Sequence, residues 1–143
     1  MAQKVYSFLD HKVIVNYPPL GRYNLSSGGI GKITVAYAGE MASITSTPSG
    51  AVIMNKKHRK DGTIAIEVPQ VGDANDFLDR WCNYARTAAT KDFATASLTI
   101  TDTVTGKNVT CNGVAPQKQA DVVYDEDAQT RPWTFVCAEI IMP

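Results

Sequence analysis

The sequence has no net charge and no long apolar run. Its 143 residues include 14 Lys and Arg and 14 Asp and Glu, so it lacks the overall attraction to phosphate that is typical of a dedicated nucleic-acid-binding protein. No apolar stretch approaches the roughly 20 residues that a membrane-spanning helix needs, which excludes a transmembrane protein. The opening segment, MAQKVYSFLD, has no apolar core and no small-residue cleavage site. We therefore expect no secretory signal and synthesis in the cytoplasm.

Cysteine and histidine are scarce, and no common catalytic motif is present. The three cysteines have no CxxC spacing and no neighbouring histidine, which excludes a disulfide framework and a zinc site. We expect all three to be buried as small apolar side chains. The sequence contains no GxSxG, HExxH or P-loop motif and no recognisable pair of catalytic carboxylates. It therefore predicts a protein that is not an enzyme and has no cofactor or metal site.

Leucine is also scarce, with five residues against 13 Val, 10 Ile and 14 Thr. β-Branched side chains pack better on a pleated sheet than in a helix. Apolar residues alternate with others over Ile33–Tyr37 and Thr63–Val68, as in half-buried strands. Further strands are predicted at His11–Asn16, Met41–Ser46, Ala51–Asn55, Ser97–Asp102, Asn108–Cys111, Gly113–Lys118 and Arg131–Ile140. The pattern indicates eight to nine strands, mostly antiparallel, joined by turns at Thr47–Gly50, Lys60–Gly62 and Val104–Lys107.

One helix is expected between these strands, over Asn75–Arg86. Asp73 is in position to cap it. The apolar stripe consists of residues at fourfold spacing, Phe77, Trp81, Ala85 and Ala89, with Leu78 and Cys82 alongside. This stripe predicts a helix that packs one face against the sheet and exposes the other.

The charges are divided unevenly along the chain. Residues 1–60 carry eight Lys and Arg but two Asp and Glu, whereas residues 61–143 carry six and twelve. If the two halves end on different faces, copies could pair head to tail; if they intermix, no such pairing follows. The difference is concentrated in a basic cluster, Asn55–Lys60, and an acidic cluster, Asp125–Asp127. Such clusters are typical of solvated loops and also of contacts between subunits.

Composition and spacing alone indicate a soluble β-sheet domain with one helix and leave self-association open. The order of several segments, however, resembles the tail tube proteins of contractile-tailed bacteriophages. The segments that carry this resemblance are Gly31–Val35, Thr63–Gln70, the helix Asn75–Arg86, Leu98–Asp102, the turn Val104–Lys107, Val109–Cys111, Trp133–Phe135 and the opening Tyr6–Asp10. The resemblance covers most of the chain and departs from the family pattern in Lys12–Leu25 and Lys56–Lys60.

The resemblance implies a mainly β fold with one α-helix, an antiparallel β-sandwich or barrel, in a single tail-tube domain spanning residues 1–143. It implies that six copies form a ring and that rings stack into a hollow tube through which DNA passes during ejection. A sheet from each subunit would join those of its neighbours, which removes exposed sheet edges. A long hairpin at about residues 38–62, centred on Met41–Lys60, would bridge subunits.

The resemblance also implies contacts and a location. The residues expected at subunit interfaces are Met54, Asn55, Lys56, Lys57, His58, Arg59, Lys60, Asp125, Glu126 and Asp127. The partners are further copies of the chain, the tail sheath protein, a tape-measure protein in the lumen, the baseplate hub, the tail terminator, and DNA in transit without specific binding. The location is the virion, in the phage tail, with assembly in the host cytoplasm. We expect a neutral or acidic lumen, since a row of cations would hold phosphate, and we expect Thr99 and Thr101 on the sheet face away from the core.

Three other interpretations stay open. The chain could form another ring of the tail, such as a terminator or baseplate ring, and open stacking separates a tube from these. It could form the tube of a phage-derived injection system, which needs the same ring. A monomeric β-barrel binding module is the third, but it would expose aromatic side chains on one sheet face. Trp81, Trp133 and Phe135 instead fall on apolar stripes.

Overall fold

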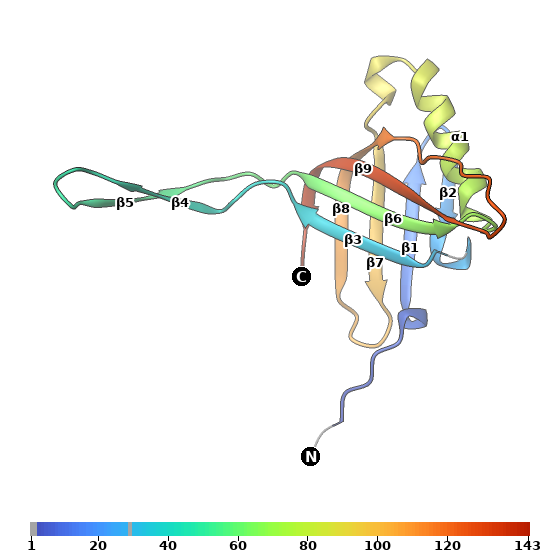
Figure 1. Ribbon diagram of the computed structural model, residues 1–143, viewed down its shortest axis with the longest axis horizontal. Coiled ribbons are helices and arrows are strands. Elements are labelled where there is room, and N and C mark those ends of the chain that lie inside the picture. The colour runs from blue at the N-terminus through green and yellow to red at the C-terminus, as the bar shows by residue number, and fades with distance from the viewer. Residues whose placement is uncertain (1–2, 29) are drawn as a thin grey trace.

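The chain forms nine strands, most of them from the alternating β-branched segments, among residues 3–28 and 30–143, which are the residues that the computed structural model describes. The strands are β1 (His11–Tyr17), β2 (Gly21–Asn24), β3 (Lys32–Tyr37), β4 (Ala42–Ser46), β5 (Val52–Lys56), β6 (Gly62–Pro69), β7 (Ala96–Asp102), β8 (Asn108–Lys118) and β9 (Thr130–Ile141). Seven of them form one antiparallel sheet in the order β2-β1-β7-β8-β9-β6-β3, while β4 pairs with β5 alone (Figure 1). The helices are α1 (Ala74–Thr87) and the short 3₁₀ turns η1 (Phe8–Asp10), η2 (Leu25–Gly28) and η3 (Thr90–Asp92).

The predicted mainly β fold with one α-helix is confirmed, but one predicted break between strands is wrong and one strand was not predicted. The segments Asn108–Cys111 and Gly113–Lys118 are one continuous strand, β8, rather than two. Strand β2 was not predicted, because Gly-Arg-Tyr-Asn is short and has no apolar alternation. Tyr23 nevertheless packs against the core from this strand, where its ring stacks on Phe77 with centroids 4.7 Å apart.

The large sheet is open and sharply bent. Its edge strands are β2 and β3, and in Figure 1 β3 and β6 run across the picture whereas β1 and β7 run down it. The bend involves β8 at Gly113, where φ is +67° and where β8 has an extra residue opposite the Ala96/Ser97 step of β7. A Cβ at Gly113 would lie 2.9 Å from the Cβ of Ala138. Only glycine fits this bulge without strain, and the bulge redirects the strand over the core.

Helix α1 covers one face of the bent sheet with the predicted apolar stripe. Phe77, Trp81 and Ala85 are buried, whereas Ala89 lies beyond the helix, which ends at Thr87, and is exposed. The ring of Trp81 stacks on Phe135 of β9 at 4.7 Å between centroids. The predicted packing of one helix face is therefore confirmed, apart from its last residue.

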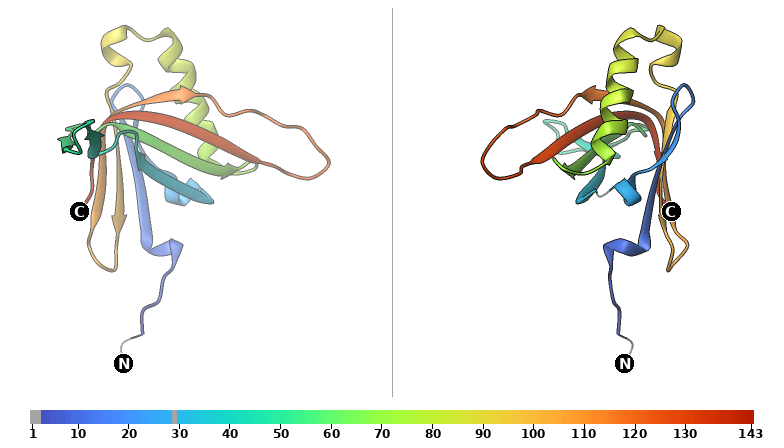
Figure 2. Two further views of the ribbon diagram at one scale, coloured as in Figure 1. Left: turned by 60° about the vertical axis from the view of Figure 1, so that its left-hand side comes forward. Right: turned by 90° about the vertical axis from the view of Figure 1, so that its right-hand side faces the viewer.

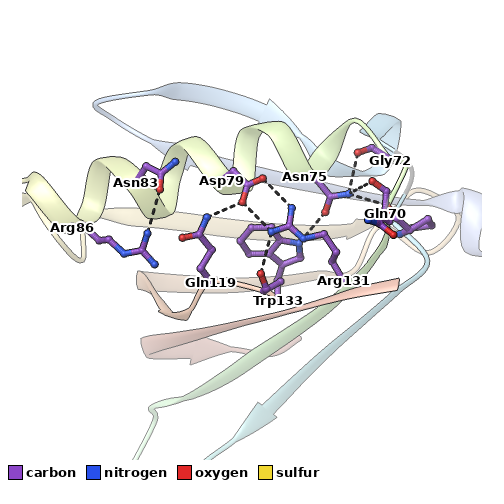
Figure 3. Close-up of polar contacts among 11 residues, drawn as sticks. Gln70, Gly72, Asn75, Asp79, Asn83, Arg86, Gln119, Arg131 and Trp133 are labelled. Carbon is purple, nitrogen blue, oxygen red and sulfur yellow. Dashed lines mark hydrogen bonds and ion pairs between the residues drawn. The ribbon is translucent and has the colours of Figure 1, made fainter. Parts of the chain in front are cut away.

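The helix does not begin in the predicted way. Asp73 occupies the N-cap position, but its side chain makes no capping hydrogen bond. The polar contact is made instead by Asn75, whose Nδ2 donates to the carbonyl oxygens of Pro69 (2.8 Å) and Gln70 (3.2 Å), while its Oδ1 accepts from Trp133 Nε1 (3.0 Å) (Figure 3). A buried amide thus ties the start of α1 to the end of β6 and to β9.

The three cysteines are free and buried, as predicted. Burial raises the pKa of Cys82 to about 11 and that of Cys111 to about 12, so both thiols stay protonated at neutral pH. Thr99 and Thr101 point away from the apolar core, because their neighbour Leu98 is fully buried and Ile100, which lies between the two threonines, packs against the core. Within the described part of the chain, no helix is long and apolar enough to span a membrane.

Candidate subunit interface

The hairpin β4–β5 stands apart from the large sheet. In Figure 1 it extends along the long axis of the molecule, beyond the end of β3 and β6. Its tip is a turn at residues 47–50, where Gly50 has a φ of +87° and the Thr47 amide donates to the Ala51 carbonyl (2.9 Å). The hairpin therefore lies within the range of residues 38–62 predicted from sequence.

The two faces of this hairpin differ in polarity. Cross-strand partners share a face in an antiparallel pair, so the pairs Ile44↔Met54 and Ser46↔Val52 place three apolar side chains together. Ile44 and Met54 are 64% and 71% exposed. On the other face, Asn55 Nδ2 donates to Ser43 Oγ (3.3 Å) and Thr45 Oγ1 (3.0 Å). An isolated two-stranded hairpin is marginally stable in water, and this one leaves its apolar face uncovered by its own subunit.

An ion pair holds the base of the hairpin. Arg59 donates from Nε to Asp61 Oδ1 (3.1 Å) and from Nη2 to Asp61 Oδ2 (2.7 Å). This hydrogen-bonded contact keeps the pKa of the Asp61 carboxyl below its ordinary value. The arginine stem lies over Gly39, where a Cβ would be 2.8 Å from Arg59 Cδ. Arg59, expected at a subunit interface, is thus engaged within its own chain.

The remaining cations of the basic cluster surround a hollow of about 440 Å³ at the hairpin base. Its lining is Tyr37, Gly39, Met41 and Lys56–Lys60. The Tyr37 hydroxyl donates to the Ile140 carbonyl (3.0 Å), and the Ile140 amide donates to the Lys60 carbonyl (2.9 Å), so β9 fixes this wall. Met41 is 84% exposed. The hollow combines an apolar wall with several positive charges.

The acidic cluster lies in a long connection, residues 119–129, between β8 and β9. Asp125, Glu126 and Asp127 are all exposed, and Tyr124 is 90% exposed. The left view of Figure 2 shows this connection standing out from the body on the side opposite to the hairpin. It is held at its end by Gln129, whose carbonyl accepts from the Gln70 amide (2.8 Å). The acidic segment itself is thus presented to solvent.

An ion pair between a buried arginine and a partly exposed aspartate anchors the same connection to helix α1. Arg131 donates from Nη1 to Asp79 Oδ2 (2.9 Å) and from Nη2 to Asp79 Oδ1 (3.1 Å) and to the Ala120 carbonyl (3.1 Å) (Figure 3). Gln119 Nε2 also donates to Asp79 Oδ1 (2.8 Å). The Arg131 hydrogen bond lowers the pKa of Asp79, and the guanidinium lies 4.6 Å from the centroid of the Trp133 ring. Both ends of the acidic connection are therefore fixed by hydrogen bonds, whereas residues 121–128 between them are exposed to solvent.

Replacing Asp79 with Asn is expected to lower the free energy of unfolding by about 2 kcal/mol near pH 7, because the buried Arg131 would lose its charged hydrogen-bond partner, which is itself one third exposed to solvent. The pKa of Asp79 is lowered in the folded state, so its contribution is present above the unfolded pKa of about 3.9 and is lost as pH falls through the folded value. Urea unfolding from pH 7 to 3 measures this. The difference between wild type and Asp79→Asn should shrink toward pH 3.

The matched control is Asp76→Asn, which changes an exposed acid in the first turn of the same helix. It should cost no more than about 0.5–1 kcal/mol, the value of a charge at a helix start. Equal losses in the two variants would contradict the assigned role of the Asp79–Arg131 pair.

The structure does not bring the basic and acidic clusters together within one subunit. Both flank strand β6, at opposite ends: Tyr37, beside the hollow, pairs with Gly62, whereas Thr130, after the acidic connection, pairs with Pro69. The eight residues of β6 rise about 23 Å between these ends. One subunit therefore presents positive charge at one end of β6 and negative charge at the other.

Several residues of this surface were not predicted from sequence. Asp61 was missed as the partner of Arg59, and Tyr37 and Met41 as the apolar wall of the hollow. Arg131 was assigned to a strand without a role, although its place on the stripe with Trp133 and Phe135 was a signal that a buried cation needs a partner. Within residues 3–28 and 30–143, no group of His, Cys, Asp or Glu is arranged to hold a metal ion.

A bent, open sheet with one covering helix is a fold shared with tubes and terminators of contractile injection systems. One match is the sheath/tube terminator of an extracellular contractile injection system, PVC, in its extended state, with 12% identity, a TM-score of 0.66, and coverage of 100% of this chain and 99% of that chain. Another is a chain in the structure of the PVC sheath-tube complex in its extended state, with 10% identity, a TM-score of 0.63, and coverage of 99% of this chain and 93% of that chain. A third is a chain in the structure of the baseplate of the anti-feeding prophage, with 10% identity, a TM-score of 0.66, and coverage of 100% of this chain and 97% of that chain. These likenesses establish the fold.

The chain belongs to the bacteriophage PhiTE tail tube protein family, whose model matches residues 3–142. No curated protein matches the chain significantly. Family membership confirms three predictions: the resemblance to tail tube proteins of contractile tails, a structural role in the phage tail, and the absence of enzymatic activity. As a tail component, the protein is located in the virion.

Proposed function

We propose that the protein is the subunit of the inner tail tube, in which six copies form a ring and rings stack into a channel that passes DNA during ejection. In this proposal residues 1–143 act as one tail-tube domain, and the hairpin at about residues 38–62 bridges subunits. The observation that carries it is the hairpin β4–β5, which projects from the body and leaves the apolar side chains of Ile44, Val52 and Met54 exposed. A subunit that worked alone would have no use for this uncovered face.

The open sheet supports the same proposal. Its edge strands β2 and β3 have no further strand partner among the described residues, and unpaired edges are sites of association with other chains. When neighbouring subunits join at these edges, the sheets of a ring close into a barrel that no single subunit forms. The Thr-rich face, with Thr99 and Thr101, then faces either lumen or sheath.

The expected partners follow from this place in the tail. They are further copies of the chain, the tail sheath protein around the tube, the tape-measure protein inside it, the baseplate hub at one end and the tail terminator at the other, with assembly in the host cytoplasm. Two structures of similar fold come from a sheath-tube complex and a baseplate, which supports contacts of this kind. DNA passes without specific binding, in keeping with a net charge of zero.

The alternative function is a single ring at the end of the tube, and the likeness to a sheath/tube terminator favours including it. The tube of a phage-derived injection system is a further alternative, because it needs the same kind of ring-forming subunit. Open stacking of rings distinguishes a tube subunit from a terminator or baseplate ring. A monomeric binding module is the least supported alternative, because the large aromatic residues Trp81, Trp133 and Phe135 are fully buried.

Changing Ile44 and Met54 together to Ser is expected to leave the monomer as stable as wild type and to abolish stacking. Both side chains are exposed in the subunit, so their loss costs the monomer little, whereas burial of each in a subunit contact would contribute about 1.5–3 kcal/mol. Thermal unfolding measures the first effect and electron microscopy the second. The comparison variant is Ile53→Ser, on the opposite, polar face of the hairpin. Tubes formed normally by the Ile44/Met54 variant would contradict a bridging role for this face.

A further inference from the structure

The acidic connection contains a short segment whose chemistry matches the hollow at the hairpin base. The segment Val122–Asp127 begins with three exposed apolar residues and ends with three acids. Its third residue, Tyr124, is 90% exposed. Apolar and aromatic side chains held in water next to acids are typical of a segment that docks on another surface.

The hollow has the complementary order of apolar and charged groups. Its apolar wall is Tyr37 and Met41, and its rim carries the ammonium groups of Lys56, Lys57 and Lys60. Arg59 is already paired with Asp61, so these three lysines are the cations of the cluster without a carboxylate partner among the described residues. An aromatic ring followed by three carboxylates fits an apolar wall followed by three ammonium groups.

The occupant of the hollow is not the segment of the same subunit. The two lie at opposite ends of β6, about 23 Å apart along the strand, and they point to opposite sides of the body in the left view of Figure 2. Complementary patches on different parts of one chain make a heterologous contact, which produces a ring or an open stack rather than a closed dimer. A second copy of the chain is therefore the occupant that the geometry favours.

We propose that the segment Val122–Asp127 of one subunit docks in the hollow at the hairpin base of a second subunit. The Tyr124 ring packs beside Tyr37 and Met41, and the carboxylates of Asp125–Asp127 face Lys56, Lys57 and Lys60. This deepens the proposed function, on which it rests, by naming the two surfaces that meet. Because the paired charges are near solvent, the contact weakens as salt rises.

Cross-linking between two variants tests this pairing directly. Ala128→Cys, next to the docking segment, is made in a size-tagged copy and His58→Cys, on the lining of the hollow, in an untagged copy, so that the side chains of the proposed contact are all kept. The mixture is assembled and mildly oxidised. The native thiols are buried and do not compete. The control mixture pairs Ala128→Cys with Val104→Cys, a residue 72% exposed in the β7–β8 turn. Docking predicts at least about tenfold more tagged–untagged dimer with His58→Cys than with Val104→Cys, since it raises the local concentration of the two thiols.

The same samples are imaged by electron microscopy, so that the pairing and the proposed function are judged separately. Tubes with the predicted cross-link support both. Tubes without it overturn the pairing alone and leave the hollow to another occupant. The cross-link without tubes supports the pairing and contradicts the tube. If the sample shows no tubes and no cross-link, both the pairing and the proposed function are contradicted. A yield that is equal in the two mixtures also overturns the pairing.

Discussion

Replacing Lys56, Lys57 and Lys60 with Glu is expected to leave a folded monomer that no longer assembles. All three side chains are exposed, and exposed charges contribute about 0–1 kcal/mol to monomer stability. In the proposed contact, however, the new carboxylates would face Asp125–Asp127 of the neighbouring subunit, and like charges at an interface cost several kcal/mol. Circular dichroism measures the fold, and light scattering with electron microscopy measures assembly.

Arg59 is kept in this variant because its loss would release Asp61 and the packing over Gly39. The matched control changes Lys4, Lys91 and Lys107 to Glu, three exposed lysines away from the hairpin that give the same net charge. The control should assemble. Restoration of assembly by adding Asp125→Lys, Glu126→Lys and Asp127→Lys to the first variant would support direct pairing. If the variant with Glu at positions 56, 57 and 60 instead formed normal tubes, the basic cluster would be a solvent-exposed loop that takes no part in assembly.

Truncation of Trp81 to Ala is expected to lower the free energy of unfolding by about 4 kcal/mol, equivalent to a fall of roughly 10–16 °C in Tm for a chain of this size. Trp81 is fully buried and contacts the aromatic rings of Phe135, Tyr17 and Phe77. Its indole N–H has no hydrogen-bond partner within the described residues, so its contribution comes from packing. Differential scanning calorimetry measures the change.

The control for Trp81 is Tyr84→Ala on the same helix. Tyr84 is 39% exposed and makes an edge contact with Tyr17, with ring centroids 5.8 Å apart. We expect a loss of about 1 kcal/mol, comparable to one aromatic pair. A similar loss from both substitutions would contradict the central place of Trp81 between α1 and the sheet.

Much of the fold was predictable because it depends on local periodicity. The two alternating segments became β3 and β6, and the stripe of Phe77 and Trp81 became the buried face of α1. The continuity of β8 was not predictable, because Gly113 reads as a break in sequence while its positive φ makes it a bulge within a strand. A turn and a bulge use the same residue type, and only the pairing of β7 with β8 distinguishes them.

The candidate interface was predictable in position but not in geometry. Charge runs identified the hairpin base and the acidic connection, since runs of like charge are visible in any sequence. The pairing of Arg59 with Asp61, two residues away, depends on side-chain direction. The pairing of Arg131 with Asp79 joins residues 52 positions apart in the sequence. Neither is encoded in the spacing of charged residues. That the two clusters flank opposite ends of β6 follows from strand register, and this placement is the reason the proposed contact between copies is head to tail.

The central claim, that this tail tube family protein forms stacked rings, is tested most directly by negative-stain electron microscopy of the purified protein at rising concentration. The account predicts hollow rings that stack into open-ended tubes, with or without the baseplate ring as a nucleus. Rings that never stack would assign the chain to a terminator or baseplate ring. A protein that stays monomeric at every concentration, even with the baseplate nucleus present, would contradict the account.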